Sequence, residues 1–295
     1  MTADIIDGKA IAGQVLGELR PRVEALRKRG VAPGLAFVLL GEDPASVSYV
    51  RAKGKDCADV GIETETFRLP AQATQEEIIE VVSQINDDAR WHGQIVQLPL
   101  PEHVDAEAVI AAVDPAKDVD GIHPASQGKL LRGLPTYLPA TPHGVQQLLV
   151  RSGHPPDGKH VVVCGRSNLV GKPLATLLMQ KRPGVNATVT VCHTGTPDLG
   201  EFTRQADILV AAMGRAGAIT AAMVREGVVV IDVGMNSIPD ASRKSGRRLV
   251  GDVDFDAVRE KAAAITPVPG GVGPMTRAML LVNTVIAAEG GPERI

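Results

Sequence analysis

Short apolar runs alternate with helically spaced apolar segments along the whole chain. Runs typical of buried strands lie at 35–40, 159–165 and 228–232, and segments of helical periodicity separate them. Parallel strands need long crossover connections, usually helices, so this alternation predicts βαβ units and parallel sheets. A chain of 295 residues is long enough for two such domains. We therefore expect an α/β fold with two domains.

The expected elements fall into two series separated by a proline-rich connection at 131–144. Helices are expected over 6–29, 43–61, 74–89, 105–113, 144–151, 170–180 and 276–288, with Thr74 and Thr276 as N-caps. Strands are expected over 35–40, 64–69, 94–98, 159–165, 187–192, 207–212 and 228–232. The last helix is expected to pack back on the first domain. The polar and basic segment 237–249 is expected to be an exposed loop.

The overall composition excludes several classes of protein. A formal net charge of −3 gives no electrostatic argument for binding nucleic acid or an anionic membrane. The three cysteines, Cys57, Cys164 and Cys192, are far apart, which argues against a disulfide framework or a metal site and suits a reducing cytoplasm. We expect neither a signal peptide at the N-terminus nor a membrane span, because no apolar run is long enough to cross a bilayer.

One helical face carries an unusual set of side chains. In the helix expected over 43–61, Tyr49 and Lys53 are four residues apart and project side by side, with Ser46 one turn earlier. The chain has only two tyrosines, four phenylalanines and one tryptophan, so a tyrosine is a scarce choice here. An aromatic plate beside an amine can hold a flat ring and act on it. The alternative interpretation is a solvated lysine beside a half-buried tyrosine.

A strand, a glycine turn and a helix start follow one another at 161–173. Backbone N–H groups at a helix N-terminus stabilise anions, so Gly165, Arg166 and Ser167 are candidates for a phosphate site. The spacing from Gly165 to Gly171 departs from the usual dinucleotide pattern, and a structural tight turn is the alternative.

The strand expected over 187–192 indicates which dinucleotide the site prefers. Sites selective for NAD place a carboxylate after this strand, but here it is followed by His193 and Thr194. Arg166 suits the 2′-phosphate of NADP, so the pattern favours NADP over NAD. His193 either assists the phosphate or caps the strand.

Three further polar segments lie where ligands bind in parallel sheets, beyond the strand ends. Gln97 lies in an apolar strand just before the turn at Pro99, where an unpaired polar group costs stability. Its alternative role is a bond to neighbouring backbone. Asp120 precedes Gly121 and is either a ligand contact or a turn former. The segment 266–276 is rich in glycine and proline, which lets backbone approach a ligand closely.

Taken in order, these motifs resemble one family over nearly the whole chain. They are Asp43-Pro-Ala-Ser46-x-x-Tyr49-Val-x-x-Lys53, Val96-Gln-Leu-Pro-Leu-Pro101, Lys117-Asp-Val-Asp-Gly121, Gly165-Arg-Ser-x-x-Val-Gly-x-Pro173, Ile231-Asp-Val-Gly-x-Asn236 and Thr266-Pro-Val-Pro-Gly-Gly-Val-Gly-Pro-Met-Thr276. The sequence resembles the bifunctional methylenetetrahydrofolate dehydrogenase/methenyltetrahydrofolate cyclohydrolase family. The resemblance implies an N-terminal α/β folate-binding catalytic domain (1–140 and 275–295) and a Rossmann-like NADP-binding domain with a parallel sheet (141–274). It also implies a homodimer, a folate substrate and a place in one-carbon metabolism and purine biosynthesis.

The resemblance also implies roles for individual residues. Lys53 is the central catalytic residue, Gln97 its partner, Tyr49 a contact of the folate and Asp120 a holder of the pterin. The implied folate-binding residues are Ser46, Tyr49, Gln97, Leu98, Pro99, Asp120, Pro269, Gly270 and Gly273. The implied NADP-binding residues are Gly165, Arg166, Ser167, Val170, Gly171, His193, Thr194, Gly214, Asp232, Gly234 and Thr276.

Several positions depart from the family pattern. Ser126 stands where an asparagine is usual, Ala140 replaces a cysteine, Thr194 a serine and Ala216 a proline. The shorter Ser126 puts the link between the two activities in question. Two alternatives stay open, a dehydrogenase with little cyclohydrolase activity and a non-catalytic NADP-sensing or folate-storing protein. The intact Ser46, Tyr49 and Lys53 argue against the second.

Overall fold

The chain divides into two compact units, each built from two stretches of sequence. The computed structural model describes residues 2–243 and 246–292. One unit, here called the six-strand unit, comprises Met1–Ala12 and Thr141–Thr276; the other, the three-strand unit, comprises Gly13–Ala140 and Arg277–Ile295. Each unit has its own parallel sheet, so the α/β class with two domains is confirmed.

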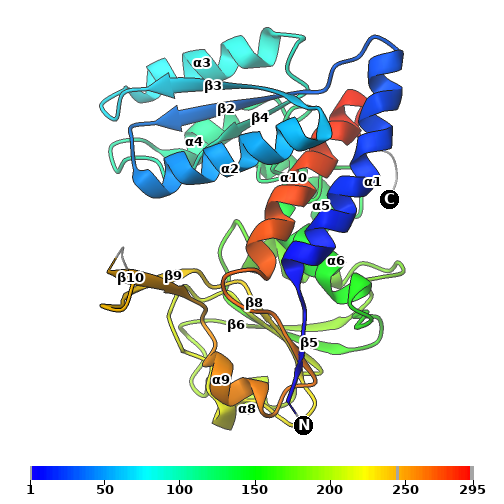
Figure 1. Ribbon diagram of the computed structural model, residues 1–295, viewed down its shortest axis with the longest axis vertical. Helices are drawn as coiled ribbons and strands as arrows, with labels where there is room; N and C mark the ends of the chain where they lie inside the picture. The colour runs from blue at the N-terminus through cyan, green and yellow to red at the C-terminus, as the bar shows by residue number, and fades with distance from the viewer. Residues whose placement is uncertain (1, 244–245, 293–295) are drawn as a thin grey trace. The chain divides into compact units, whose positions relative to one another are not determined.

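The three-strand unit has a parallel sheet in the order β3-β2-β4. Strand β2 is buried along its whole length because it lies between two neighbours and is covered on both faces. Helices α2 and α3 cover opposite faces of the sheet (Figure 1). The elements are α1 (Gly8–Lys28), β2 (Gly34–Leu40), α2 (Pro44–Val60), β3 (Glu63–Leu69), α3 (Gln75–Asp87), β4 (Gly93–Val96), α4 (Ala106–Ala111), α5 (Pro124–Leu131) and α10 (Val272–Ala288).

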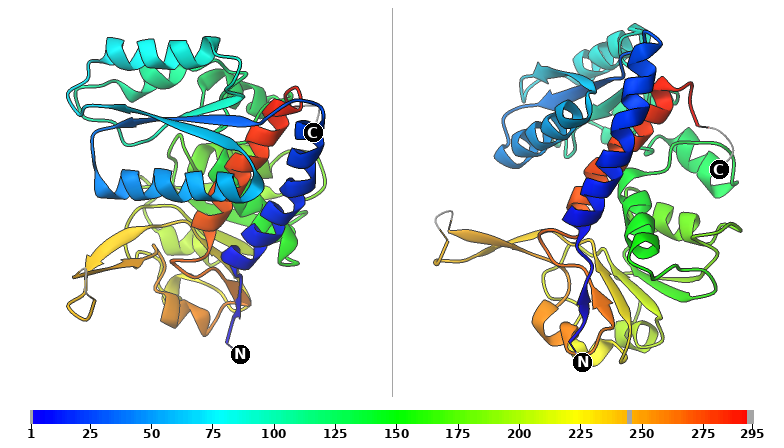
Figure 2. Two further views of the ribbon diagram at one scale, coloured as in Figure 1. Left: turned by 45° about the horizontal axis from the view of Figure 1, so that its top comes forward. Right: turned by 45° about the vertical axis from the view of Figure 1, so that its right-hand side comes forward.

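The final helix packs inside the three-strand unit, as the sequence predicts. Helices α10 and α1 run side by side in both views of Figure 2, and Arg22 forms an ion pair with Glu289 at 2.6 Å. The buried Asn283 donates from its side-chain amide to the carbonyl oxygens of Val119 and Leu138, both at 2.8 Å. These bonds tie α10 to the segment between α4 and the end of this unit.

The six-strand unit has a parallel sheet in the order β1-β11-β8-β7-β5-β6. Its strands are rich in valine and isoleucine, which suits strands buried on both faces. The elements are β1 (Asp4–Ile5), α6 (Ala140–Arg151), β5 (His160–Cys164), α7 (Gly171–Leu178), β6 (Thr188–Cys192), α8 (Leu199–Thr203), β7 (Ile208–Ala211), η1 (Ala221–Met223), β8 (Val229–Asp232), β9 (Asn236–Pro239), β10 (Arg247–Val250), α9 (Phe255–Arg259) and β11 (Ala264–Ile265).

The segment expected to be an exposed loop at 237–249 forms a β-hairpin instead. Strands β9 and β10 pair antiparallel, with Asn236 opposite Val250 and Pro239 opposite Arg247. Both faces of this hairpin are largely exposed, so it lacks the apolar run by which buried strands are recognised. Residues 244 and 245 of the predicted loop lie outside the described residues.

Two helices begin earlier than the sequence predicts, and both have a proline in the first turn. Helix α6 begins at Ala140 rather than Gly144, and α10 begins at Val272 rather than at Thr276. Proline is tolerated in a first turn because the N–H group it lacks would have no helical partner. Thr276 is therefore not an N-cap, and its hydroxyl donates to the carbonyl oxygen of Val272 at 3.4 Å. By contrast, Thr74 caps α3 in a full capping box.

The boundaries of the two units differ from the expected ones at the N-terminus. The sequence assigned residues 1–140 to one domain, whereas residues up to Ala12 belong to the six-strand unit. The physical reason is β1, in which Asp4 and Ile5 pair in parallel with Ala264 and Ile265 of β11. A strand of two residues is too short to show any periodicity in sequence.

Candidate active site and nucleotide cavity

Helix α2 places three of the predicted residues on one face. The helix begins sharply because Asp43 accepts the N–H of Ser46 at 2.8 Å and Pro44 occupies its first turn. It ends at Gly61, whose φ of 89° is the left-handed conformation that glycine tolerates. Ser46 and Lys53 are buried on this face, with Tyr49 partly buried between them.

The amine of Lys53 lies in a buried and specific environment. Only 5% of the Lys53 side chain is exposed, which is rare for a lysine without a partner. Its Nζ donates to Oε1 of Gln97 at 3.2 Å and lies 4.8 Å from the centre of the Tyr49 ring. The interpretation of Lys53 as a solvated surface residue is therefore wrong.

The strand end holds Gln97 so that its amide oxygen is available to this amine. The backbone N–H of Gln97 donates to the carbonyl oxygen of Val38 in β2, just after β4 ends. Its side-chain Nε2 donates to the carbonyl oxygen of Leu98 at 2.6 Å, which fixes the amide plane. The Leu98–Pro99 peptide bond that follows is cis. Gln97 thus bonds both the neighbouring backbone and the Lys53 amine.

The charges around Lys53 act on its pKa in opposite directions. Burial lowers the pKa of Lys53, while the carboxylate of Asp120 and the thiol of Cys57 raise it and the positive charge of Arg277 lowers it. Burial likewise raises the pKa of Asp120, and the charge of Lys53 opposes that rise. Burial, with a smaller contribution from Asp120, raises the pKa of Tyr49 to about 12, so its hydroxyl stays protonated.

Sequence reasoning missed the pair formed by Arg277 and Asp56. Arg277 Nε donates to Asp56 Oδ2 at 2.5 Å, and the two side chains are only 25% and 17% exposed. Asp56 lies three residues after Lys53 on α2, and Arg277 lies on α10. No pattern in the sequence links positions so far apart, although their charges both act at the lysine site.

The Ser126 departure lies next to a second buried carboxyl group. Asp118 accepts the backbone N–H groups of Ile122 at 3.2 Å and of His123 at 2.9 Å. Burial raises the pKa of Asp118 to about 6, and the hydrogen bond from the Ser126 side chain opposes that rise. Ser126 is itself buried, so the shorter side chain still bonds Asp118 and helps hold the segment that carries Asp120.

A cavity of about 460 Å³ lies at the carboxyl ends of β5, β6 and β7 in the six-strand unit. Its lining contains five of the residues predicted to bind the dinucleotide: Gly165, Arg166, Ser167, His193 and Thr194. Cys164, Cys192, Thr196, Leu199, Ala212, Met213 and Arg215, which were not predicted, also line it. Two arginines and no carboxylate are in this set, which suits a ligand that carries phosphates.

The glycines at this cavity allow close backbone approach. A Cβ on Gly165 would lie 2.1 Å from the carbonyl oxygen of Ala212, and one on Gly171 would lie 2.1 Å from the carbonyl oxygen of Gly165. Only glycine therefore lets this turn pack against β7 and then enter α7. The Ser167 hydroxyl accepts the N–H of Val170 at 3.1 Å and stabilises the same turn. The two arginines of the cavity and the glycine turn that allows close backbone approach together fit a dinucleotide.

The other six predicted positions do not line this cavity but support its surroundings or lie elsewhere in the unit. They are Val170, Gly171, Gly214, Asp232, Gly234 and Thr276. Thr276 exchanges a hydrogen bond of 2.9 Å with Thr141. His193 Nδ1 accepts the N–H of Gly195 at 3.0 Å, so its ring shapes the loop after β6 while lining the cavity.

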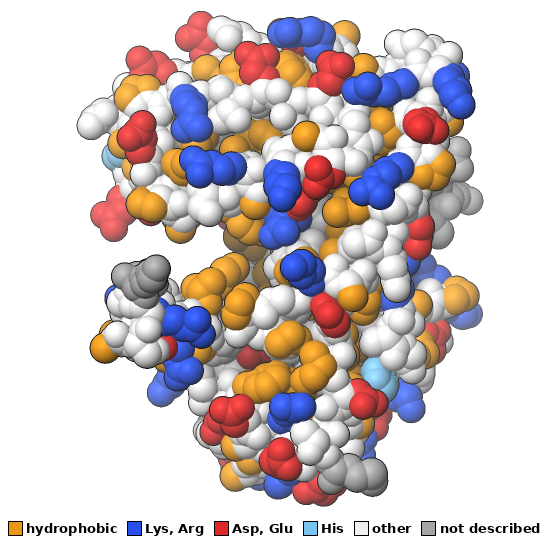
Figure 3. Space-filling view, in the orientation of Figure 1, with side chains coloured by type: hydrophobic (Ala, Val, Ile, Leu, Met, Phe, Trp, Pro, Cys, Tyr) orange, Lys and Arg blue, Asp and Glu red, His pale blue; other side chains and the backbone are white. Residues whose placement is uncertain are grey.

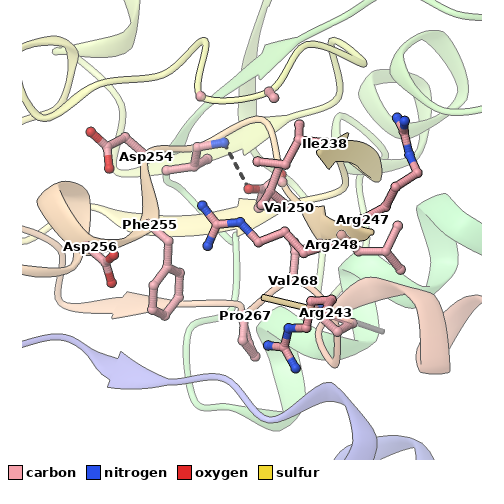
Figure 4. Close-up of a pocket in the computed structure, with 17 residues that line it drawn as sticks. Ile238, Arg243, Arg247, Arg248, Val250, Asp254, Phe255, Asp256, Pro267 and Val268 are labelled. Carbon is pink, nitrogen blue, oxygen red and sulfur yellow. Dashed lines mark hydrogen bonds between the residues drawn. The ribbon is translucent and has the colours of Figure 1, made fainter. Parts of the chain in front are cut away.

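The same unit has a larger cavity of about 840 Å³ beside the β9–β10 hairpin. Arg247 and Arg248 of β10 and Phe255 of α9 lie around it, as Figure 4 shows. Asp232 lines this cavity rather than the first one, and its oxygens accept three backbone N–H groups. Pro269 lines it as well, whereas Gly270 and Gly273 are not among its lining residues.

The surface shows no concentration of one charge on the face in Figure 3. Lys and Arg side chains are interspersed there with Asp and Glu side chains, in keeping with the net charge of −3. Within residues 2–243 and 246–292, none of the helices is long and apolar enough to cross a membrane. The same residues contain no group of three or more His, Cys, Asp or Glu side chains arranged to hold a metal ion.

The sequence matches two models of one family. Residues 6–120 match the tetrahydrofolate dehydrogenase/cyclohydrolase catalytic domain, and residues 139–291 match the tetrahydrofolate dehydrogenase/cyclohydrolase NAD(P)-binding domain. The bifunctional protein FolD of Dehalococcoides mccartyi (strain CBDB1) is 55% identical over 291 residues, which cover 98% of each chain.

Solved structures of similar proteins have the same fold over nearly the full length. The bifunctional FolD methylenetetrahydrofolate dehydrogenase/cyclohydrolase of Campylobacter jejuni is 43% identical with a TM-score of 0.91, covering 97% of this chain and 99% of its own. The methylenetetrahydrofolate dehydrogenase-cyclohydrolase of Trypanosoma brucei, solved with NADP and an inhibitor, is 41% identical with a TM-score of 0.92, covering 98% of both chains.

Proposed function

The chain belongs to the tetrahydrofolate dehydrogenase/cyclohydrolase family, and on that premise we propose two linked activities for it. It oxidises 5,10-methylenetetrahydrofolate to 5,10-methenyltetrahydrofolate with NADP, and it hydrolyses the product to 10-formyltetrahydrofolate. The observation that carries this proposal is the buried Lys53 amine, bonded to Gln97 and placed over the ring of Tyr49. Burying an amine in this way costs folding free energy, and buried groups with a perturbed pKa are concentrated at functional sites.

The oxidation requires orientation more than acid or base. Bound NADP supplies the two-electron acceptor. Gly165, Arg166 and Ser167 would hold its phosphates through backbone N–H groups and the guanidinium, with His193 and Thr194 beside them. In the three-strand unit, the ring of Tyr49 offers a face on which the flat folate ring can stack. Holding both reactants in a productive geometry removes a large part of the entropic barrier.

The hydrolysis requires a group that moves protons, and Lys53 is suited to this. Burial lowers the pKa of its amine, so a larger fraction is neutral than for an exposed lysine. A neutral amine still donates one N–H to Gln97 Oε1, which leaves its lone pair directed elsewhere. Lys53 takes one proton from the water that attacks the methenyl carbon, and returns it to the ring nitrogen as the carbon–nitrogen bond breaks. The second proton of that water leaves to solvent as the formyl C=O bond forms.

The carboxyl group of Asp120 serves both binding and tuning in this proposal. As an acceptor it suits the N–H donors at the edge of the pterin. Its negative charge also keeps the pKa of Lys53 from falling as far as burial alone would take it. Ser46, Leu98 and Pro99 complete the proposed folate pocket of the three-strand unit.

We assign the folate chemistry to the three-strand unit and NADP binding to the six-strand unit, and we propose a homodimer formed through the latter. Strand β6 is an edge of the sheet, with one row of its backbone groups open to pairing. Exposed apolar side chains occur on β6 and next to α7, namely Val191, Leu169 and Met179. The three cysteines are free thiols, which suits a cytoplasmic location.

A single spectrophotometric experiment tests the proposed function. Purified protein is mixed with 5,10-methylenetetrahydrofolate and either NADP or NAD, and reduced cofactor and methenyl product are followed together. Reduction of NADP with little methenyl accumulation supports both activities, and a separate assay with methenyl substrate measures the hydrolysis alone. Accumulation of methenyl product would restrict the function to the dehydrogenase. No reduction of either cofactor would refute the enzyme assignment.

A further inference from the structure

Asp252 is a fully buried carboxylate that none of the assigned functions uses. Its exposed fraction is 0%, and only Gly251 separates it from the end of β10. Its Oδ2 accepts the backbone N–H groups of Met213 at 2.5 Å and Gly214 at 2.9 Å, and its Oδ1 accepts that of Arg215 at 2.8 Å. Asn236 Nδ2 also donates to Oδ1, at 2.8 Å. Three successive N–H groups form an anion-binding concavity, and a side chain of the protein occupies it.

Asp252 is itself held in place by a second buried carboxyl group. Its backbone N–H donates to Asp232 Oδ1 at 2.9 Å, and that of Val253 donates to Asp232 Oδ2 at 2.9 Å. The glycines around the pair leave no room for larger residues. A Cβ on Gly251 would lie 1.8 Å from Asp232 Oδ2, and one on Gly234 would lie 2.3 Å from Asp252 Oδ1. The position of the Asp252 carboxylate is therefore tightly defined.

The turn that Asp252 holds forms one wall of the nucleotide cavity. It follows the carboxyl end of β7, and both Met213 and Arg215 line the cavity of about 460 Å³. Gly214 between them has a φ of 66°, a conformation that makes the turn costly to rebuild with other residues. Arg215 is the second guanidinium of the cavity, with Arg166 as the first. Among the residues that the structure describes, only the Asp252 carboxylate accepts all three N–H groups of this turn.

We propose that Arg215 binds a phosphate of the dinucleotide and that Asp252 is the positioning residue that presents it. This inference rests on the proposed NADP-binding function. A guanidinium pairs with phosphate through two parallel hydrogen bonds, so its contribution depends on its direction as well as its charge. By fixing the backbone N–H of Arg215, Asp252 fixes where that side chain starts. Its effect on binding is therefore exerted through Arg215.

A double-variant experiment on NADP affinity tests this dependence. The dissociation constant is measured by equilibrium titration for Arg215→Gln, Asp252→Asn and the double variant. Arg215→Gln removes the charged contact, and we expect the dissociation constant to rise about tenfold, as for a lost charge-assisted hydrogen bond of about 1.4 kcal/mol. Asp252→Asn replaces one of the two acceptor oxygens by an NH2 group that faces N–H donors, and we expect a similar rise. Because both act through one contact, the double variant should bind no more weakly than the weaker single variant.

Asp207→Asn is the matched control for structural damage. Asp207 is a carboxylate of the same unit that accepts a backbone N–H, that of His160 at 2.8 Å, just before β7 begins. Its loss weakens the bond to the His160 N–H and removes an ion pair with Arg225, both at the opposite end of the strand from the cavity. The control should lower the melting temperature while leaving the dissociation constant for NADP within twofold of the original value. Repeating the titrations with NAD shows which phosphate Arg215 binds. If it binds the 2′-phosphate, the variants weaken the binding of NADP alone. If it binds the pyrophosphate, they weaken the binding of both NADP and NAD.

The outcomes separate this inference from the function on which it rests. If the unaltered protein does not bind NADP at all, the proposed function itself is refuted. If it binds but Arg215→Gln changes nothing, or if the effects of the two single variants simply add, the inference is refuted. Should Asp252→Asn fail to fold, hydrogen exchange on the unaltered protein decides. The amides of Met213, Gly214 and Arg215 should be protected without NADP, and free exchange would refute the role of Asp252.

Discussion

Replacing Lys53 by methionine should separate the two proposed activities. Methionine is unbranched and similar in length, so it fills the same buried space without the amine. The change leaves Gln97 Oε1 without its donor at 3.2 Å, which costs about 1–3 kcal/mol of unfolding free energy if nothing replaces that bond. Removing a lysine that is only 5% exposed also removes the cost of burying an amine, which offsets part of this loss. The variant should therefore fold.

The loss of proton transfer should be far larger than the loss of stability. General acid–base catalysis contributes about 10²–10⁴-fold, so we expect hydrolysis of 5,10-methenyltetrahydrofolate to fall by at least about 10²-fold in Lys53→Met. The dissociation constant for NADP should stay within twofold. The assay follows the loss of methenyl absorbance, corrected for the uncatalysed hydrolysis, together with an NADP titration.

The matched control is Lys55→Met, two residues further along the same helix. Lys55 is exposed, so its replacement removes the same charge from α2 without changing the buried site. It should retain hydrolysis within twofold. The reasoning fails if Lys53→Met hydrolyses the methenyl substrate at more than about a tenth of the original rate, or if Lys55→Met is equally impaired.

Three further changes test the surroundings of both sites. Arg277→Gln removes a positive charge that lowers the pKa of Lys53, so the rise of cyclohydrolase kcat/KM with pH should move to higher pH. A shift of this rise to lower pH would contradict the sign of the argument. Asn283→Ala leaves two buried carbonyl oxygens without donors, so urea denaturation should show the free energy of unfolding to fall by about 3 kcal/mol. A fall of less than about 1 kcal/mol would mean that water replaces the amide. Gly165→Ala places a Cβ 2.1 Å from the Ala212 carbonyl oxygen, on a backbone whose φ is 135°, so calorimetric titration should detect no NADP binding. Normal affinity for NADP would disprove this close approach.

The fold could be predicted where elements bury an apolar pattern and not where they lack one. The buried strands β2, β5 and β8 show as continuous runs, because both of their faces are covered. The hairpin of β9 and β10 is exposed, so its pairing is set by backbone bonds that leave no apolar trace. Prolines made two helices look shorter than they are. In the sequence, the prolines in the first turns of α6 and α10 indicate a loop, although proline is also tolerated in the first turn of a helix.

The lysine site could be predicted because one helix carries most of it. Ser46, Tyr49 and Lys53 are related by helical spacing alone, so sequence suffices to bring them together. Gln97 and Asp120 were suspected separately, from a polar residue in a strand and from an acid before glycine. That Gln97 meets the amine follows from the register of β4 against β2, which pairs Val96 with Val38. Arg277 and Asp56 meet only through packing of α10 on α2, which spacing cannot show.

The acids that follow strands were the least predictable part of the nucleotide site. Loops at the carboxyl ends of parallel strands contain backbone N–H groups without a sheet partner, and these need an acceptor when they are buried. A carboxylate can accept these N–H groups as well as it can bind a ribose, so an acid at such a position in a sequence is compatible with a structural role and with a cofactor-binding role. Asp232 was assigned to the cofactor, although its oxygens accept N–H groups of Gly234, Asp252 and Val253. Asp252, which holds the wall of the cavity, was not suspected. The distinction lies in where the N–H groups are, and only the folded backbone shows that.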